Sequence, residues 1–131
     1  KERGFNVTGT AAEHYNNAVT ASILYWGGTA AEAAAYLLQP SVNYATAATT
    51  WQEKIGTQKW IAMYNRTVEA WTELRRLDFP KLTAPAAAKS GFPTRLTYPT
   101  NEQTLNGANY TAASAKIGSD KVETKIFWDK F

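Results

Sequence analysis

The chain has 131 residues, which is about one domain and long enough to bury a hydrophobic core. Its formal charge is +3, and its Lys and Arg residues are dispersed, so it lacks the basic stripe that a nucleic-acid backbone requires. It contains no Cys, which excludes disulfides, thiolate catalysis and Cys-based metal sites.

The sequence has no apolar run that approaches the roughly 20 residues of a membrane helix, and it shows no signal peptide. It opens with Lys1-Glu2-Arg3-Gly4, without an initiator Met. We therefore expect a processed or truncated piece, with any targeting segment upstream of Lys1.

Three capping boxes predict helices in the first half of the chain. In this motif a Thr at the N-cap and a Glu three residues later satisfy each other's free backbone N–H groups. The pairs are Thr10 with Glu13, Thr29 with Glu32, and Thr50 with Glu53. Each pair precedes an apolar or Ala-rich run, so residues 10–77 are predicted to be helical.

The first two predicted helices form a hairpin. The apolar face of the first consists of Ala12, Tyr15, Val19, Ile23 and Trp26. Gly27-Gly28 ends this helix, and Pro40 closes the second, Ala-rich one. The short connection predicts antiparallel packing, and the small Ala side chains allow a close approach, as in tetratricopeptide-type repeats. The sequence shows no clean 34-residue repeat.

Residues 50–77 are predicted to form two helices with a kink near Asn65, one ending at about Tyr64 and the other at about Leu77. An apolar stripe runs through both and consists of Trp60, Tyr64, Val68, Trp71 and Leu74. We expect Trp60 and Trp71, like Trp26, to pack in the core.

After Phe79-Pro80 the chain becomes rich in Pro, and residues 78–99 are predicted to be loop. A helical turn is expected at 102–106 and a short helix at 109–117, ended by Gly118. Residues 122–128 are a short strand or an extended tail. The expected fold is therefore mainly α, with one portion spanning 1–131. Tetratricopeptide-like hairpins form a scaffold at 10–77, and a long irregular C-terminal segment with short helices follows at 78–131.

The titratable residues do not form a recognisable catalytic or metal site. His14 is the only His, at the start of a helix, and a metal site needs several convergent ligands. Glycoside hydrolysis needs two opposed carboxylates, whereas Glu13, Glu32 and Glu53 have capping roles. Glu69 and Glu73 lie one helical turn apart, where ordinary ion pairs form. We expect no enzyme activity, no cofactor and no metal.

Four charged residues and three aromatic residues remain as candidates. Arg75, Arg76, Arg95 and Glu102 form either a ligand clamp or a structural tie. The tie is favoured, because a long loop leaves backbone groups that need partners and Arg offers five donors.

The aromatic residues least constrained by the helical pattern are Trp51, Tyr36 and Tyr44. Tyr44 and Trp51 are the candidates for a platform that stacks on a sugar.

Several segments together resemble SusD-like (SusD/RagB) proteins. They are Gln58-Lys59-Trp60-Ile61, Glu69-Ala70-Trp71 with Arg75-Arg76, Arg95-Leu96-Thr97-Tyr98-Pro99 with Glu102 and Asn106, and Phe127-Trp128-Asp129. The segment from Ala30 to Pro40 also resembles the helical part just upstream in that family. The order and spacing of these segments carry the resemblance, which covers roughly residues 10–129 and corresponds to the C-terminal portion of the longer family proteins.

The resemblance implies a function. SusD-like proteins are non-enzymatic surface lipoproteins of the outer membrane in Bacteroidetes-type bacteria. They capture glycans, or in some cases peptides, for import through a SusC-type TonB-dependent transporter. The family's lipid-anchoring Cys is missing from this chain, so membrane attachment would depend on an anchor outside it. A free-standing helical-repeat module that binds other proteins is the alternative.

The resemblance does not carry over a ligand site, because the ligand-contacting aromatics of the family lie mostly upstream of the matched region. It implies a structural role for the motif residues, which lock the C-terminal segment onto the helical scaffold. These residues are Trp71, Arg75, Arg76, Arg95, Tyr98, Pro99 and Glu102.

Overall fold

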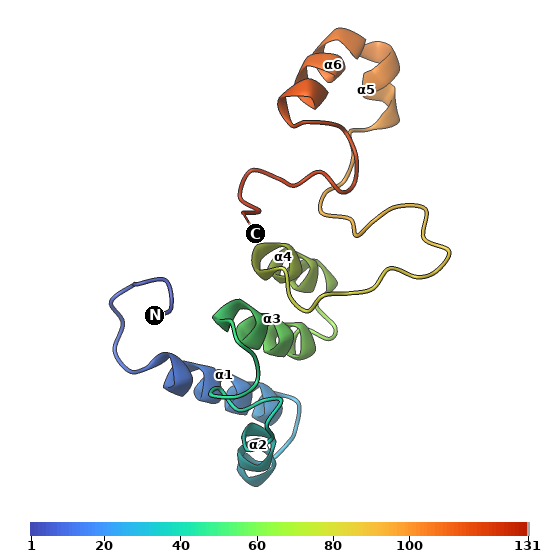
Figure 1. The fold of residues 1–131 in the computed structure, drawn as a ribbon. Coiled ribbons are helices and arrows are strands. Elements are labelled where there is room, and N and C mark those ends of the chain that lie inside the picture. The colour runs from blue at the N-terminus through green and yellow to red at the C-terminus, as the bar shows by residue number, and fades with distance from the viewer. Residues whose placement is uncertain (131) are drawn as a thin grey trace. The chain divides into compact units, whose positions relative to one another are not determined.

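The computed structural model describes residues 1–130, which contain α-helices and no strand (Figure 1). The prediction of a mainly α fold is confirmed. The helices are α1 (Ala11–Tyr25), α2 (Ala30–Leu37), α3 (Trp51–Ala62), α4 (Thr67–Leu77), α5 (Thr100–Leu105) and α6 (Gly107–Lys116). The chain divides into two compact units, Lys1–Pro80 and Lys81–Phe131. None of the helices in the described residues has the length and apolarity to cross a membrane.

The predicted capping boxes start α1 and α2. The Thr10 backbone N–H donates to Glu13 Oε2 at 2.6 Å, and the Glu13 N–H donates to Thr10 Oγ1 at 3.1 Å. Thr29 and Glu32 repeat this exchange at the start of α2. The third box is only half formed, because Thr50 Oγ1 accepts the Glu53 N–H while the Glu53 side chain does not return the bond.

The turn between α1 and α2 is a Schellman motif, the hydrogen-bonded ending in which a left-handed Gly follows the helix. Gly27 has φ +88°, its N–H donates to the Leu24 carbonyl, and the Gly28 N–H donates to the Ile23 carbonyl at 2.9 Å. A Cβ on Gly28 would lie 2.6 Å from Ile23 Cγ2. The two glycines therefore bring α2 back against α1, with which it packs (Figure 1).

The core of the N-terminal unit is small. Its buried apolar residues are Tyr15, Val19, Ala33, Val42, Ala70, Leu74 and Leu77. Tyr15 fills the space between α1 and the loop after α2, and its hydroxyl donates to the Val42 carbonyl at 2.6 Å. Ala33 is wholly buried, which agrees with the close approach of α1 and α2 that small side chains permit.

The prediction that residues 60–74 form one continuous apolar face is wrong. Tyr64 is 84% exposed and Val68 is 68% exposed. The reason is the break between Ala62 and Thr67. The spacing of one helix does not continue across it, so side chains before and after the break need not share a face. Within α4 the buried positions are Ala70, Leu74 and Leu77, and these have the expected helical spacing.

Helices α3 and α4 pack against each other and are joined by charge as well as by apolar contact. Glu73 of α4 accepts Lys59 Nζ of α3 at 2.8 Å and also pairs with Arg76. Burial opposes ionisation of Glu73, but the hydrogen bonds from Arg76 and Lys59 outweigh it and lower the pKa of its carboxyl. One carboxylate thus links both helices and pairs with two cations, Lys59 and Arg76.

The irregular part of the C-terminal unit is held by contacts between residues 91–98 and 119–124. The Val122 carbonyl accepts the Thr94 N–H at 2.7 Å, and Glu123 Oε1 accepts the Gly91 N–H at 2.8 Å. Residues 122–128 do not form a strand, and two turns interrupt the expected extended tail, closed by the Thr124 N–H on the Lys121 carbonyl and the Asp129 N–H on the Ile126 carbonyl. The short helices α5 and α6 pack together beside this loop (Figure 1).

Asp120 is the centre of these loop contacts. Its Oδ1 lies 3.0 Å from Arg95 Nη1, with both side chains largely buried, and it accepts the Tyr98 N–H at 3.1 Å. The Arg95 guanidinium also lies over the Tyr98 ring, 4.9 Å from its centroid. Arg95, which the sequence grouped with Glu102 in a structural tie, thus pairs with Asp120. Glu102 is one turn into α5 and accepts Asn106 Nδ2 instead.

We predict that Gly56→Ala destabilises the protein. A Cβ at Gly56 would lie 2.8 Å from the Phe79 carbonyl oxygen and 2.9 Å from Phe79 Cβ. Overpacking costs about 1–3 kcal/mol, which exceeds the roughly 1 kcal/mol that Ala gains over Gly in a helix. Urea unfolding followed by circular dichroism measures the difference. Gly107→Ala, with open space around it, is the control and should be neutral or stabilising. Equal stabilisation by both would contradict the close contact.

We also predict that Arg95→Ala lowers the free energy of unfolding by about 1–3 kcal/mol, because it leaves the buried Asp120 carboxylate without its cation. Glu102→Gln should change it by less than about 0.5 kcal/mol, as is usual for a surface site. Amide hydrogen exchange at Tyr98 gives a local readout, since its N–H donates to Asp120. Unchanged protection of that amide in the Arg95→Ala variant would refute the central role of the pair.

Candidate functional site

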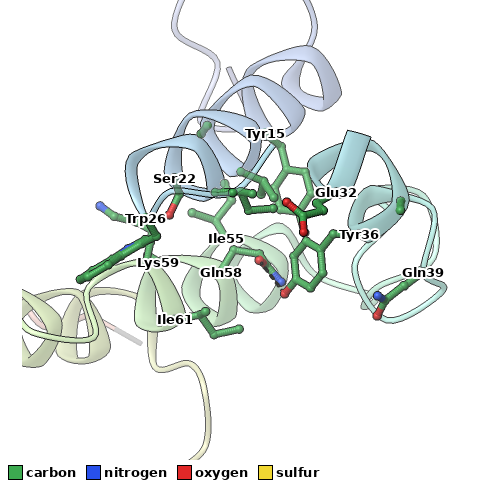
Figure 2. A pocket seen from close by; sticks show the side chains of 16 residues that line it. Tyr15, Ser22, Trp26, Glu32, Tyr36, Gln39, Ile55, Gln58, Lys59 and Ile61 are labelled. Atoms are coloured by element: carbon green, nitrogen blue, oxygen red, sulfur yellow. Dashed lines mark hydrogen bonds between the residues drawn. The ribbon is translucent and has the colours of Figure 1, made fainter. Parts of the chain in front are cut away.

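A pocket of about 670 Å³ opens between α1, α2 and α3 in the N-terminal unit (Figure 2). This volume lies within the range of about 300–1,000 Å³ that is usual for small-molecule sites. The aliphatic part of its wall consists of Ala18, Val19, Ile23, Ala35, Ile55, Ile61 and Ala62. All of its lining residues belong to the unit Lys1–Pro80.

Two aromatic side chains lie on different sides of the pocket. Trp26 comes from the end of α1, and Tyr36 comes from α2 on the other side (Figure 2). Trp26 is 49% exposed, and its backbone N–H is fixed by the carbonyl of Ser22. Tyr25 packs edge-on against the Trp26 ring, with 5.5 Å between the centroids. About half of Trp26 is therefore exposed at the pocket, and the end of α1 fixes the position of its backbone.

Amide and hydroxyl groups are set among the apolar walls. The Tyr36 hydroxyl donates to Gln58 Oε1 at 3.2 Å and so connects α2 with α3 (Figure 2). Gln58 Nε2 donates to no group in the described residues, which leaves both of its hydrogens available. Gln39 and Ser22 add a further amide and a hydroxyl to the lining. These groups can donate and accept hydrogen bonds without carrying charge.

The two charged residues of the lining are already engaged. Glu32 holds the N-terminus of α2, and the hydrogen bond from the Thr29 backbone lowers the pKa of its carboxyl, so it stays ionised. Lys59 is paired with Glu73. Glu32 is the single carboxylate among the lining residues, whereas glycoside hydrolysis needs two facing a bond about 5–10 Å apart. This pocket is suited to binding and lacks that acid–base pair.

Residues 1–130 contain no group of three or more His, Asp or Glu side chains that could hold a metal ion. His14, the single His, bonds the Thr8 carbonyl through Nε2 at 2.7 Å. It lies at the start of α1 and is not among the residues that line the pocket.

Tyr44 and Trp51, the candidates from the sequence, do not line this pocket. The Tyr44 ring lies against Tyr15, with 5.3 Å between the centroids, and Lys54 Nζ lies 4.7 Å from its centroid. The Tyr44 hydroxyl donates to the Glu2 carboxylate, and its desolvation, followed by this bond, raises the pKa of Tyr44 to about 12. Trp51 is the first residue of α3 and is half-buried. A ligand contact at either residue stays a prediction.

The motif residues fall into separate local groups. In α4 the Arg75 guanidinium lies 3.8 Å from the Trp71 ring centroid, and Arg76 pairs with Glu73. In the C-terminal unit Arg95 and Tyr98 surround Asp120, and Tyr98 stacks edge-on with Tyr110. Pro99 is the N-cap of α5, which contains Glu102. None of these residues lines the pocket, and their role as a lock between the two parts of the chain stays a prediction.

Trp26 was not predicted to line a pocket, because the helical pattern places this side chain in the core. Trp26 and Trp60 are 49% and 37% exposed, so that assignment is wrong for both. The available signal was position: Trp26 comes directly before Gly27-Gly28 and is the C-cap, where the helical face no longer determines burial. Gln58 belongs to a segment that carries the family resemblance, but nothing in the sequence indicated that its amide faces a pocket.

The comparisons with known proteins agree on one family. Residues 1–99 match the family model SusD-like_2, described as "Starch-binding associating with outer membrane". The search of curated proteins returned no match.

Solved structures with the same fold include a chitin-binding SusD homologue from Flavobacterium johnsoniae, with 29% identity and a TM-score of 0.75. A SusD homologue from Bacteroides thetaiotaomicron has 25% identity and a TM-score of 0.79, and a Bacteroidetes SusD-like protein has 29% identity and a TM-score of 0.78. These matches cover 98%, 99% and 95% of this chain. The chain in turn spans 33%, 35% and 27% of those proteins.

The family model covers most of the sequence, and the structural matches extend through both units. The chain therefore belongs to the SusD-like family.

Proposed function

We propose that this protein takes part in the capture of glycans at the bacterial outer membrane, without cleaving them. The observation that carries the proposal is the family match over residues 1–99, whose description names starch binding and the outer membrane. A further solved relative, a chitin-binding protein with 33% identity over 95% of this chain, supports a carbohydrate ligand.

The composition of the pocket supports binding rather than catalysis. A half-exposed indole, a Tyr and two Gln side chains can hold a sugar, and the single carboxylate is occupied by its capping bonds. A glycosidase would need an acid whose pKa is raised, opposite a second carboxylate. Glu32 has the opposite shift, because the Thr29 backbone bond favours its charged form.

Import is the second part of the proposal. The captured glycan would pass to a SusC-type TonB-dependent transporter, with this chain supplying scaffold and partner surface, and the protein would reach the membrane through a lipid anchor outside this chain. The exposed apolar side chains of the N-terminal unit, which include Leu38, Tyr64 and Val68, give it surface for protein contacts.

We predict saturable binding of chitohexaose, maltoheptaose or both by the full-length protein in isothermal titration calorimetry. Chromatography of the same samples after prolonged incubation should recover the oligosaccharides at their original length. The controls are a titration of buffer without oligosaccharide and a titration of an unrelated helical-repeat protein. Shortened products would refute the non-enzymatic role, and the absence of binding to a broad glycan array would refute glycan capture and favour a protein-binding module.

Co-purification tests the transporter separately. Tagged full-length protein, expressed in its native membrane, should retain a SusC-type transporter in mild detergent. Loss of the transporter while glycan binding persists would remove the import step and leave the capture step intact.

A further inference from the structure

We infer that the pocket between α1, α2 and α3 is a glycan subsite that takes an uncharged sugar unit, with Trp26 as its stacking platform and Gln58 as its main polar contact. This inference rests on the proposed function and gives it a location. It assigns ligand contact to Trp26 and Gln58, which differ from the pair Tyr44 and Trp51 and from the residues expected to lock the C-terminal segment.

The first argument is the exposure of Trp26. An indole that is 49% exposed in a pocket wall loses apolar contact with water when a flat C–H face covers it. The face of a pyranose ring has that shape, and its hydroxyl groups point outward from the ring edge. Both the Trp26 indole N–H and Gln58 Nε2 are donors that use no acceptor among the described residues.

The second argument is the charge of the lining. Glu32 is engaged by Thr29, and Lys59 is paired at 2.8 Å with Glu73, a carboxylate that it shares with Arg76. An anionic ligand would find no unpaired cation in the pocket, and a cationic one would have to compete for the capping carboxylate of α2. An uncharged ligand avoids both costs, since it leaves the existing pairs in place.

The Gln58 amide favours a sugar over an apolar protein segment as the occupant of the pocket. A helix or strand seated here by its apolar side chains would cover Gln58 Nε2 and leave this donor buried without an acceptor, which is unfavourable. A sugar supplies hydroxyl oxygens to the same donor. The Tyr36 hydroxyl, held by Gln58 Oε1 at 3.2 Å, keeps its lone pairs available for a second hydroxyl.

The test compares two Trp variants of the full-length protein. Trp26→Ala should weaken the binding of chitohexaose or maltoheptaose about tenfold in calorimetry, as expected for the loss of a buried aromatic contact. Trp60→Ala is the matched control, because Trp60 is 37% exposed and lies beside Lys59 without lining the pocket. It should leave the affinity within about twofold. Circular dichroism verifies that both variants are folded.

A second variant keeps the inference testable if Trp26→Ala unfolds. Gln58→Leu preserves the size of the side chain, removes its donor and acceptor, and should weaken binding about fivefold. In the unaltered protein, the side-chain amide resonance of Gln58 should shift on titration with the same oligosaccharide.

The outcomes separate the two proposals. Binding that survives Trp26→Ala and Gln58→Leu unchanged, with an unshifted Gln58 amide, overturns this subsite and leaves glycan capture standing. A failure of the unaltered protein to bind any glycan overturns both. Protection of Trp26 from solvent quenching in the glycan-free full-length protein would show that a protein segment occupies the pocket, and it would also overturn the subsite.

Discussion

The N-terminal unit depends on the buried hydrogen bond from the Tyr15 hydroxyl to the Val42 carbonyl. The loop between α2 and α3 has few side chains in the core, so Val42 and the partner of its carbonyl determine where the loop lies. Desolvation raises the pKa of Tyr15, which keeps the phenol protonated and able to donate. Tyr15 also lines the pocket, so one side chain places α3 relative to α1 and forms part of the cavity between them.

The pocket combines features that each have a structural origin. Glu32 is present because α2 needs an N-terminal partner, and Lys59 is paired because Glu73 links α3 to α4. Their charges are thus used by the scaffold before any ligand arrives. What remains for a ligand is the uncharged part of the lining, namely the indole of Trp26, the phenol of Tyr36 and the amides of Gln39 and Gln58. The packing of the scaffold thereby determines which ligand chemistry the pocket favours.

Local signals in the sequence predicted most of the helices. Thr10 with Glu13 and Thr29 with Glu32 formed the expected capping boxes, because these bonds involve residues only three positions apart. Prediction failed where the partner was distant in sequence. Arg95 pairs with Asp120 rather than Glu102, and nothing near Arg95 indicates a carboxylate 25 positions later, since this choice depends on how the loop meets the tail. The site was missed for a related reason, because burial of Trp26 was inferred from a helical face that ends one residue before it.

Trp26 occupies a position with an unusual freedom to vary. Its backbone is held by the Schellman turn, whose bonds use only main-chain atoms and the two glycines that follow, and its side chain is not needed in the core. Replacement of this side chain therefore alters the pocket wall without altering the turn that builds the hairpin. In the proposed subsite, exchange of residue 26 for another aromatic or aliphatic side chain would change the surface offered to a ligand and keep the hairpin. Architecture and the proposed recognition are thus carried by different atoms of one residue.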